Sequence, residues 1–351
     1  MLTKQDAKMA QGLAIIAMLM LHLFCRIGEL PYNTYFYIGN KPLLYYLGLF
    51  GDICVPIYYF CSGYAQMVLM KTEHNQYCKN SSKRALRFLM HFWLIVIMFA
   101  CVGFVCGLLG IDIINTIPGE WKTFLRNLLL IENSYIGAWW FVTTYLILLL
   151  GAPFMKKLVE KVQPIILIGL SGIIYLIAYV FRFVYVLKLE QELFNWVWSQ
   201  LILFGTSQFS FIIGMIFQEY DILGKIDGRL KKQAVRVSLI TILPITVFVF
   251  HCIEESLIIA PFTAIVTLSC FHLWKKPQKV EKVFAFLGKH STNIWLTHMF
   301  FYMAPFKDLV FIAKFPLLVL VFMLVMCIMT SYVISVLESG VQRIGKRKQA
   351  R

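Results

Sequence analysis

The hydrophobic residues of this chain form long apolar runs that short polar segments separate. Each run approaches the ~20 helical residues needed to cross a hydrocarbon core of ~30 Å. The pattern therefore predicts transmembrane helices, and it leaves no room for a soluble domain between them. The ten predicted spans cover residues 9–27, 46–70, 88–111, 137–154, 164–185, 198–217, 236–253, 256–274, 290–306 and 315–337.

Composition agrees with this pattern. Hydrophobic residues make up 60% of the chain and charged residues only 15%, and the mean hydropathy of +0.73 is outside the range of soluble domains. The sequence predicts an all-α polytopic membrane protein with about ten transmembrane helices. The first run has no convincing signal-peptide cleavage site, so we expect it to be retained as a helix. We expect one membrane domain over residues 1–351, with no appended soluble domain.

The positions of lysine and arginine predict the orientation in the membrane. Basic residues of short loops are held on the cytoplasmic side, and one alternating assignment of the loops places 25 of the 33 basic residues there. Both termini are then cytoplasmic. The net charge of +15 is explained by contact with anionic lipid and not by nucleic acid. The nine cysteines lack paired spacing, so neither a disulfide framework nor a metal site is implied.

A histidine inside the first apolar run is the main candidate for chemistry, because an ionisable side chain at membrane depth is costly. At 100° per residue, His22 and Gln11 are about 20° apart on the helix, and Lys8 is displaced about 40° the other way. The three form one polar stripe, and the rise from Gln11 to His22 is about 16 Å, comparable to a pantetheine arm. A histidine that only hydrogen-bonds a neighbouring helix is an equally good reading of position alone.

Several segments, in order, resemble the membrane-bound acyltransferase-3 family. No single segment is specific; their joint order carries the resemblance, which extends over about residues 5–337. The segments are the first helix with its polar residue eleven positions before His22, Tyr59–Tyr64 (YFCSGY), Lys83–Arg87 (KRALR), Gly137–Phe141 (GAWWF) and Leu287–His298 (LGKHSTNIWLTH).

The resemblance implies a function. Members of this family move acyl groups, usually acetyl from cytoplasmic acetyl-CoA, onto hydroxyls of envelope or secreted glycans. We therefore expect an integral-membrane O-acyltransferase, with acetyl-CoA or another acyl-CoA as donor and no permanently bound cofactor. The expected partners are membrane lipid, acyl-CoA and a glycan or lipid-linked saccharide acceptor, without nucleic acid. A multi-pass protein of the bacterial plasma membrane is expected.

The resemblance also assigns roles to residues. His22 is the expected catalytic residue, as general base or as an acyl or proton relay, because imidazole titrates near neutral pH. The expected acyl-CoA contacts are Lys8, Gln11, Arg84 and Arg87, since guanidinium groups bind phosphate bidentately. The family usually has Arg or Lys in place of Gln11, and Lys8, one turn earlier, is the expected substitute.

Five further residues are expected to contact substrate or line its cavity. Four of them have a plainer alternative. Ser62 and Gly63 can serve helix packing, with the hydroxyl bonded within its own helix; Trp140 can be an interfacial anchor; Ser291 can cap a helix. The five residues are Ser62, Gly63, Trp140, Ser291 and His298.

Other polar residues near the ends of predicted helices are given ordinary solvated roles. Asp52 can orient an imidazole or face water, and the solvated reading is favoured because helix ends are wet. His91 and His251 are assigned solvated or interfacial positions for the same reason.

The rival function is a transporter or flippase for a glycan or lipid-linked sugar, although no repeat symmetry favours it. A non-catalytic scaffold or sensor is a third alternative.

Overall fold

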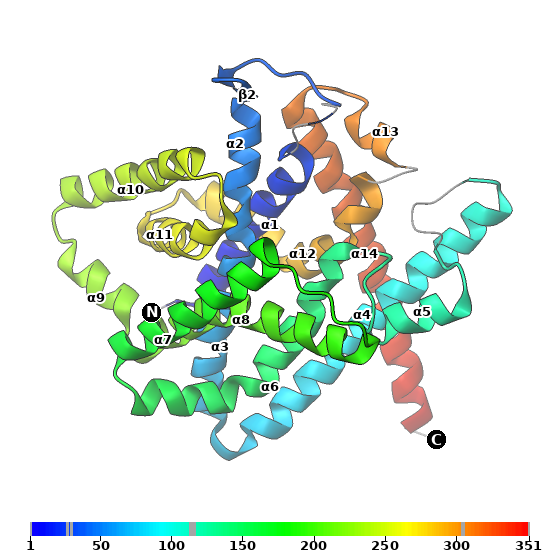
Figure 1. Cartoon of the computed structure of the whole chain (residues 1–351), viewed down its shortest axis with the longest axis horizontal. Helices are drawn as coiled ribbons and strands as arrows, with labels where there is room; N and C mark the ends of the chain where they lie inside the picture. The colour runs from blue at the N-terminus through cyan, green and yellow to red at the C-terminus, as the bar shows by residue number, and fades with distance from the viewer. Residues whose placement is uncertain (1, 26–27, 29–30, 112–116, 303–305, 350–351) are drawn as a thin grey trace. The chain divides into compact units, whose positions relative to one another are not determined.

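The computed structural model describes residues 2–25, 28, 31–111, 117–302 and 306–349 (Figure 1). In these ranges the chain is almost entirely helical, apart from one antiparallel pair of two-residue strands. The elements are α1 (Lys4–Phe24), β1 (Tyr37–Ile38), β2 (Lys41–Pro42), α2 (Leu43–Leu49), η1 (Phe50–Ile53), α3 (Cys54–Glu73), η2 (His74–Gln76), α4 (Tyr77–Leu108), α5 (Trp121–Leu128), η4 (Gly137–Trp139), α6 (Trp140–Lys161), α7 (Pro164–Tyr179), η5 (Val180–Val184), α8 (Glu192–Glu219), α9 (Ile222–Arg229), α10 (Gln233–Ile253), η6 (Leu257–Ile259), α11 (Ala260–Leu273), α12 (Gln278–Tyr302), α13 (Lys307–Phe311) and α14 (Pro316–Gln349).

The prediction of an all-α polytopic membrane protein is confirmed. Every one of the ten predicted spans coincides with a helix. Among the described residues, seven helical stretches are long and apolar enough to cross a membrane. The count differs from ten because Leu43–Leu108 forms one stretch that holds two predicted spans, Leu257–Leu273 is shorter, and α12 does not meet the same criteria. The count of ten and the cytoplasmic termini stay predictions.

The chain divides into two compact units. Unit 1 contains residues 1–26, 36–82 and 143–289, and unit 2 contains residues 27–35, 83–142 and 290–351. Three of the five boundaries fall within α4, α6 and α12.

Two close helix crossings, each made by a pair of glycines, hold unit 1 together. On α3 and α8, a Cβ added to Gly63 would lie 1.9 Å from the carbonyl oxygen of Phe211, and one added to Gly214 would lie 2.1 Å from that of Phe60. The contact is reciprocal, because each glycine faces the carbonyl three residues before the other glycine. Figure 1 shows α3 and α8 side by side. Small residues allow this approach in membrane proteins, where lipid supplies no hydrophobic force between helices.

The second crossing joins α1 to α12 in the same way. A Cβ on Gly12 would lie 2.1 Å from the carbonyl oxygen of Phe284, and a Cβ on Gly288 would lie 1.8 Å from that of Lys8. Each glycine here faces the carbonyl four residues before the other. The Leu-Gly-Lys segment of α12 is thereby packed against the backbone of a residue predicted to bind the acyl donor.

A side chain at either glycine of the α3–α8 crossing is expected to force the two helices apart. We predict that Gly63→Ala lowers the free energy of unfolding in detergent by about 1–3 kcal/mol. The measurement is a thermal or denaturant midpoint on purified protein. Gly169→Ala on α7 is the control, because a Cβ there meets no atom within 4 Å; it should leave the midpoint unchanged or raise it. Equal midpoints for the two variants would contradict the packing role of Gly63.

Candidate active site

The ten residues predicted for the site divide equally between the units. Lys8, Gln11, His22, Ser62 and Gly63 belong to unit 1; Arg84, Arg87, Trp140, Ser291 and His298 belong to unit 2. The structure therefore gives the surroundings of each group within its own unit.

The polar stripe predicted on the first helix lies on α1. A capping box starts this helix, in which Thr3 Oγ1 accepts from the Asp6 backbone N–H and Asp6 accepts from that of Thr3. Lys8 is exposed, whereas Gln11 and His22 are half-buried. His22 lies in the last turn of α1, so the stripe extends from an exposed lysine to an imidazole near the other end of the helix.

Ser62 and Gly63 differ in their surroundings although they are neighbours on α3. Gly63 is buried in the crossing with α8. The Ser62 hydroxyl oxygen is buried and has no hydrogen-bond partner among the described residues. The alternative in which this hydroxyl bonds within its own helix is therefore wrong. A buried hydroxyl without a partner costs free energy, which is a reason to consider a ligand there.

The basic cluster and the aromatic segment lie in unit 2. Arg84 is half-buried and Arg87 is exposed, three residues apart on α4. Trp140 is half-buried at the start of α6. Its neighbour Trp139 is fully buried, and its indole N–H donates to the Leu296 carbonyl at 3.0 Å. Trp139 is therefore the tryptophan that ties this segment to α12.

The second half of α12 holds two more predicted residues, both buried. Ser291 is 2% exposed and His298 is fully buried. The Nδ1 atom of His298 lies 2.7 Å from the Trp295 carbonyl oxygen. Because a carbonyl only accepts hydrogen bonds, the ring hydrogen of the neutral imidazole is on Nδ1 and the lone pair is on Nε2. This tautomer is suited to accepting a proton at Nε2.

Unit 2 contains a hydrogen-bond network that the sequence did not predict. The Ser331 hydroxyl lies 2.8 Å from His290 Nδ1 and accepts from the Asn293 amide N–H at 2.8 Å. The Asn293 amide oxygen lies 2.6 Å from His91 Nε2, and His91 Nδ1 lies 3.5 Å from a Glu338 carboxylate oxygen. The network joins α4, α12 and α14. Of the solvated or interfacial positions predicted for His91, the solvated one is wrong, since this half-buried ring is hydrogen-bonded to Asn293. The interfacial one stays a prediction.

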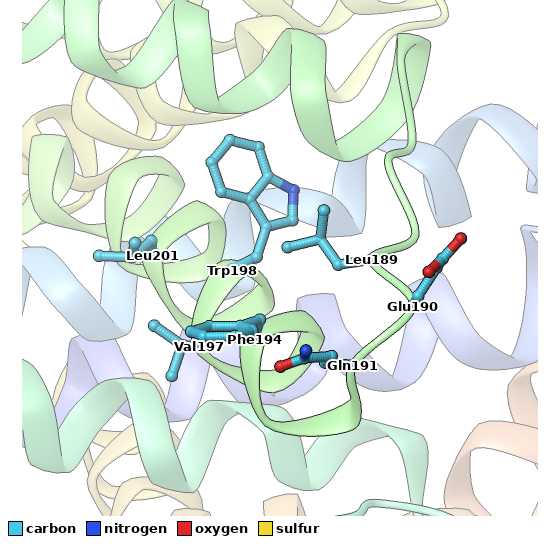
Figure 2. Close-up of a pocket in the computed structure, with 7 residues that line it drawn as sticks. All are labelled: Leu189, Glu190, Gln191, Phe194, Val197, Trp198 and Leu201. Carbon is cyan, nitrogen blue, oxygen red and sulfur yellow. The ribbon is translucent and has the colours of Figure 1, made fainter.

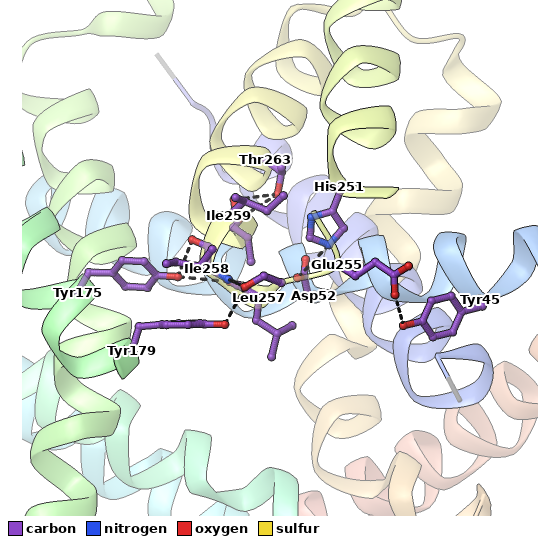
Figure 3. A network of polar contacts seen from close by, with 12 residues as sticks. Tyr45, Asp52, Tyr175, Tyr179, His251, Glu255, Leu257, Ile258, Ile259 and Thr263 are labelled. Carbon is purple, nitrogen blue, oxygen red and sulfur yellow. Dashed lines mark hydrogen bonds and ion pairs between the residues drawn. The ribbon is translucent and has the colours of Figure 1, made fainter. Parts of the chain in front are cut away.

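Asp52 in unit 1 also differs from the prediction. Its side chain is 3% exposed, and its Oδ2 atom lies 3.1 Å from Nε2 of His251, which is 1% exposed (Figure 3). The favoured solvated reading is wrong for both residues, and the alternative in which Asp52 orients an imidazole is the one observed. The sequence places both residues at helix ends, where water is the normal partner. It does not show that the two residues, 199 positions apart, are partners in the folded chain.

Polar contacts on both sides fix the segment that follows His251. Glu255 accepts a hydrogen bond from the Tyr45 hydroxyl at 2.9 Å and pairs with Lys41. The hydrogen bond from the Lys41 ammonium holds the pKa of the Glu255 carboxyl below its ordinary range, so this carboxyl is ionised at neutral pH. On the other side, the Tyr175 hydroxyl donates to the Ile258 carbonyl at 2.9 Å, and Tyr179 bonds the Ser256 hydroxyl, as Figure 3 shows.

A separate hollow of about 480 Å³ lies where the segment after η5 meets the start of α8 (Figure 2). Its wall is mainly apolar, with Leu189, Phe194 and Trp198 among the lining side chains and Glu190 as an acidic one. None of the predicted site residues lines it. Among the described residues, no group of three or more His, Cys, Asp or Glu could hold a metal ion.

A family model described as an acyltransferase domain matches residues 7–336, nearly the whole chain. The chain belongs to the acyltransferase-3 family. No curated protein and no solved structure matches it significantly. The resemblance seen in the motifs is confirmed, and this multi-pass membrane protein is an acyl-transferring enzyme. The match gives the transporter alternative no support.

In this acyltransferase, the described residues supply two kinds of chemistry. Imidazoles that can exchange protons lie in both units, at His22 and His251 in unit 1 and at His298 in unit 2. Cationic side chains that can attract an anionic donor are exposed at Lys8 and Arg87. Asp52, His251, His91, Asn293 and Ser331 were missed because only the folded chain brings each to its partner.

The Asn293 amide should be the residue on which the unit 2 network depends. We predict that Asn293→Ala lowers the free energy of unfolding by about 1–3 kcal/mol, because it removes the bonding partner of His91 and a donor to buried Ser331. Thermal midpoints in detergent provide the test. Ser335→Ala is the matched control, since that hydroxyl bonds only the carbonyl one turn earlier on α14. A midpoint for Asn293→Ala equal to the control's would show that the network contributes nothing to stability.

Proposed function

We propose that this acyltransferase moves an acyl group, most simply acetyl, from cytoplasmic acyl-CoA to a hydroxyl of an envelope or exported polysaccharide. The observation that carries the proposal is the half-buried His22 on α1, inside the matched residues 7–336. Keeping an imidazole among apolar side chains in a membrane costs free energy, and a function is the default explanation for that cost. The proposed location is the bacterial plasma membrane, with both termini in the cytoplasm.

His22 serves as general base or as an acyl or proton relay in this reaction. The acceptor oxygen forms a bond to the acyl carbon and loses its proton, while the carbon–sulfur bond of acyl-CoA breaks. The sulfur leaves with the electron pair and takes up a proton, so the transfer yields an ester and free CoA. A neutral imidazole accepts a proton near pH 7, which is what this exchange requires.

The donor contacts are proposed at Lys8, Gln11, Arg84 and Arg87. Exposed Lys8 and Arg87 are accessible to a ligand from water, and half-buried Gln11 continues the α1 stripe toward His22. CoA is anionic through its phosphates, and charge-assisted hydrogen bonds to phosphate are among the stronger ones in proteins. No permanently bound cofactor is needed for this chemistry.

The acceptor contacts are proposed at Ser62, Trp140, Ser291 and His298, with Gly63 shaping the helix beside Ser62. The support for Ser62 is its unpartnered hydroxyl, and the support for His298 is a tautomer with its lone pair on Nε2. The proposed acceptor is a glycan or lipid-linked saccharide, which meets the protein from the surrounding lipid.

Loss of the His22 imidazole should abolish transfer. We predict that His22→Ala lowers the rate at which membranes move label from radiolabelled acetyl-CoA to extracted envelope glycans by about 10²-fold or more. The comparison is made at matched membrane levels. His74→Asn is the control, because His74 is exposed and its positive φ is tolerated by asparagine. Transfer by His22→Ala at the rate of the native protein would refute the assigned role.

Neutralising an exposed donor contact should weaken acyl-CoA binding without changing the chemical step. We predict that Arg87→Gln raises the KM for acetyl-CoA by about tenfold with kcat nearly unchanged, the effect of losing one charge-assisted hydrogen bond. Steady-state kinetics with varied acetyl-CoA measure both constants. The matched control is Lys79→Gln, an exposed cation on the same helix. A KM shift of the same size in the control would indicate nonspecific electrostatics.

A further inference from the structure

The Asp52–His251 contact differs from other histidine–carboxylate contacts in this chain by the burial of both partners. The side chains are 3% and 1% exposed. In the His91–Glu338 contact the carboxylate side chain is 45% exposed, and in the His272–Asp6 contact it is 22% exposed. Taking both partners out of water requires a large desolvation free energy, which their attraction offsets only partly.

Helix α10 is buried in the protein only at this imidazole. His251 is the buried residue of α10, and the rest of the helix is exposed or half-buried on an apolar surface suited to lipid. An apolar side chain would anchor the helix at lower cost, since replacing a buried ion pair by hydrophobic residues is often neutral or stabilising. Stability alone therefore does not account for the histidine.

The dyad also has unused hydrogen-bonding capacity. Both carboxylate oxygens of Asp52 and both ring nitrogens of His251 lack a hydrogen-bond partner of ordinary geometry among the described residues. When the His251 ring is neutral, the carboxylate beside Nε2 favours the tautomer with its hydrogen on Nε2 and its lone pair on Nδ1. A carboxylate on one ring nitrogen and a lone pair on the other is the arrangement of a general base oriented for a hydroxyl.

The dyad is close to the end of α1 that carries His22. A Cβ on Gly51, the residue before Asp52, would lie 2.1 Å from the Ala17 carbonyl oxygen and 3.0 Å from the Leu21 nitrogen. The segment that holds Asp52 therefore packs on the backbone of the turn that contains His22. The Phe50 ring lies 5.8 Å from the His251 ring and covers it on one side.

We propose that His251, positioned by Asp52, is a second acid–base residue of the transferase and takes the proton from the acceptor hydroxyl. The proposal rests on the proposed function. The hydroxyl oxygen bonds to the acyl carbon as its proton passes to Nδ1 of His251, and the carbon–sulfur bond of acyl-CoA breaks. The thiolate takes a proton from His22, which acts here as the proton relay and starts as the imidazolium. His251 then loses its extra proton to water, and His22 regains one from water. Because Nδ1 is buried, the proposed step requires a small displacement of α10 that admits the acceptor.

The test compares two acceptors. Hydroxylamine attacks through a neutral nitrogen that needs no base, whereas a glycan hydroxyl does. We expect His251→Gln to lower kcat for the glycan by about 10²-fold or more, with its KM and the transfer to hydroxylamine near native values. Asp52→Asn should act in the same direction. The control is His272→Gln, which removes another half-buried histidine of unit 1 and should change neither rate.

A second variant separates catalysis from folding. Asp52→Leu combined with His251→Leu should keep or raise the thermal midpoint while transfer to the glycan is lost. Equal loss of transfer to both acceptors, or native rates with the glycan, would overturn the role of the dyad while leaving the His22-dependent reaction intact. Failure of the native protein to transfer label to either acceptor would instead overturn the proposed function.

Discussion

The close approach of helix backbones at paired glycines is the constraint on which unit 1 depends. Lipid around a membrane protein is as apolar as its helices, so hydrophobic burial does not drive the helices together. Close van der Waals packing stabilises their association instead. The α1–α12 and α3–α8 crossings bring carbonyl oxygens to positions that a Cβ would occupy. Because α1 carries His22 and α3 carries Ser62, the same contacts that hold the helices together also set where these two proposed site residues lie.

Polar side chains within these helices fall into two groups. One group is satisfied by protein partners, as with Asn293 and Ser331 in unit 2, and such networks specify one arrangement of their helices. The other group is buried with bonding capacity left over, as with Ser62 and the Asp52–His251 dyad. The second group has a physical reason to meet a ligand, and Ser62 and the Asp52–His251 dyad both lie in unit 1.

The sequence predicted the fold class and the family well because both depend on local patterns of residues. Apolar runs located the long helices, and short motifs such as Tyr59–Tyr64 carried the family resemblance. It did not predict which polar residues meet. Asp52 and His251 are each at a helix end, where water is the normal partner, and the Gly51 contact with α1 that draws Asp52 inward depends on a backbone approach no local pattern encodes.

The exposed, largely apolar surface of α10 has a mechanical consequence. At 21 residues the helix is about 31 Å long, close to the thickness of the hydrocarbon core. A thinner or thicker bilayer is accommodated by changes in helix tilt at a small cost per ångström of mismatch. Because the buried end of α10 is His251, we expect such a tilt to change the position of the imidazole relative to the Asp52 carboxylate, which lies on η1. The geometry of the dyad is then expected to depend on the thickness of the membrane.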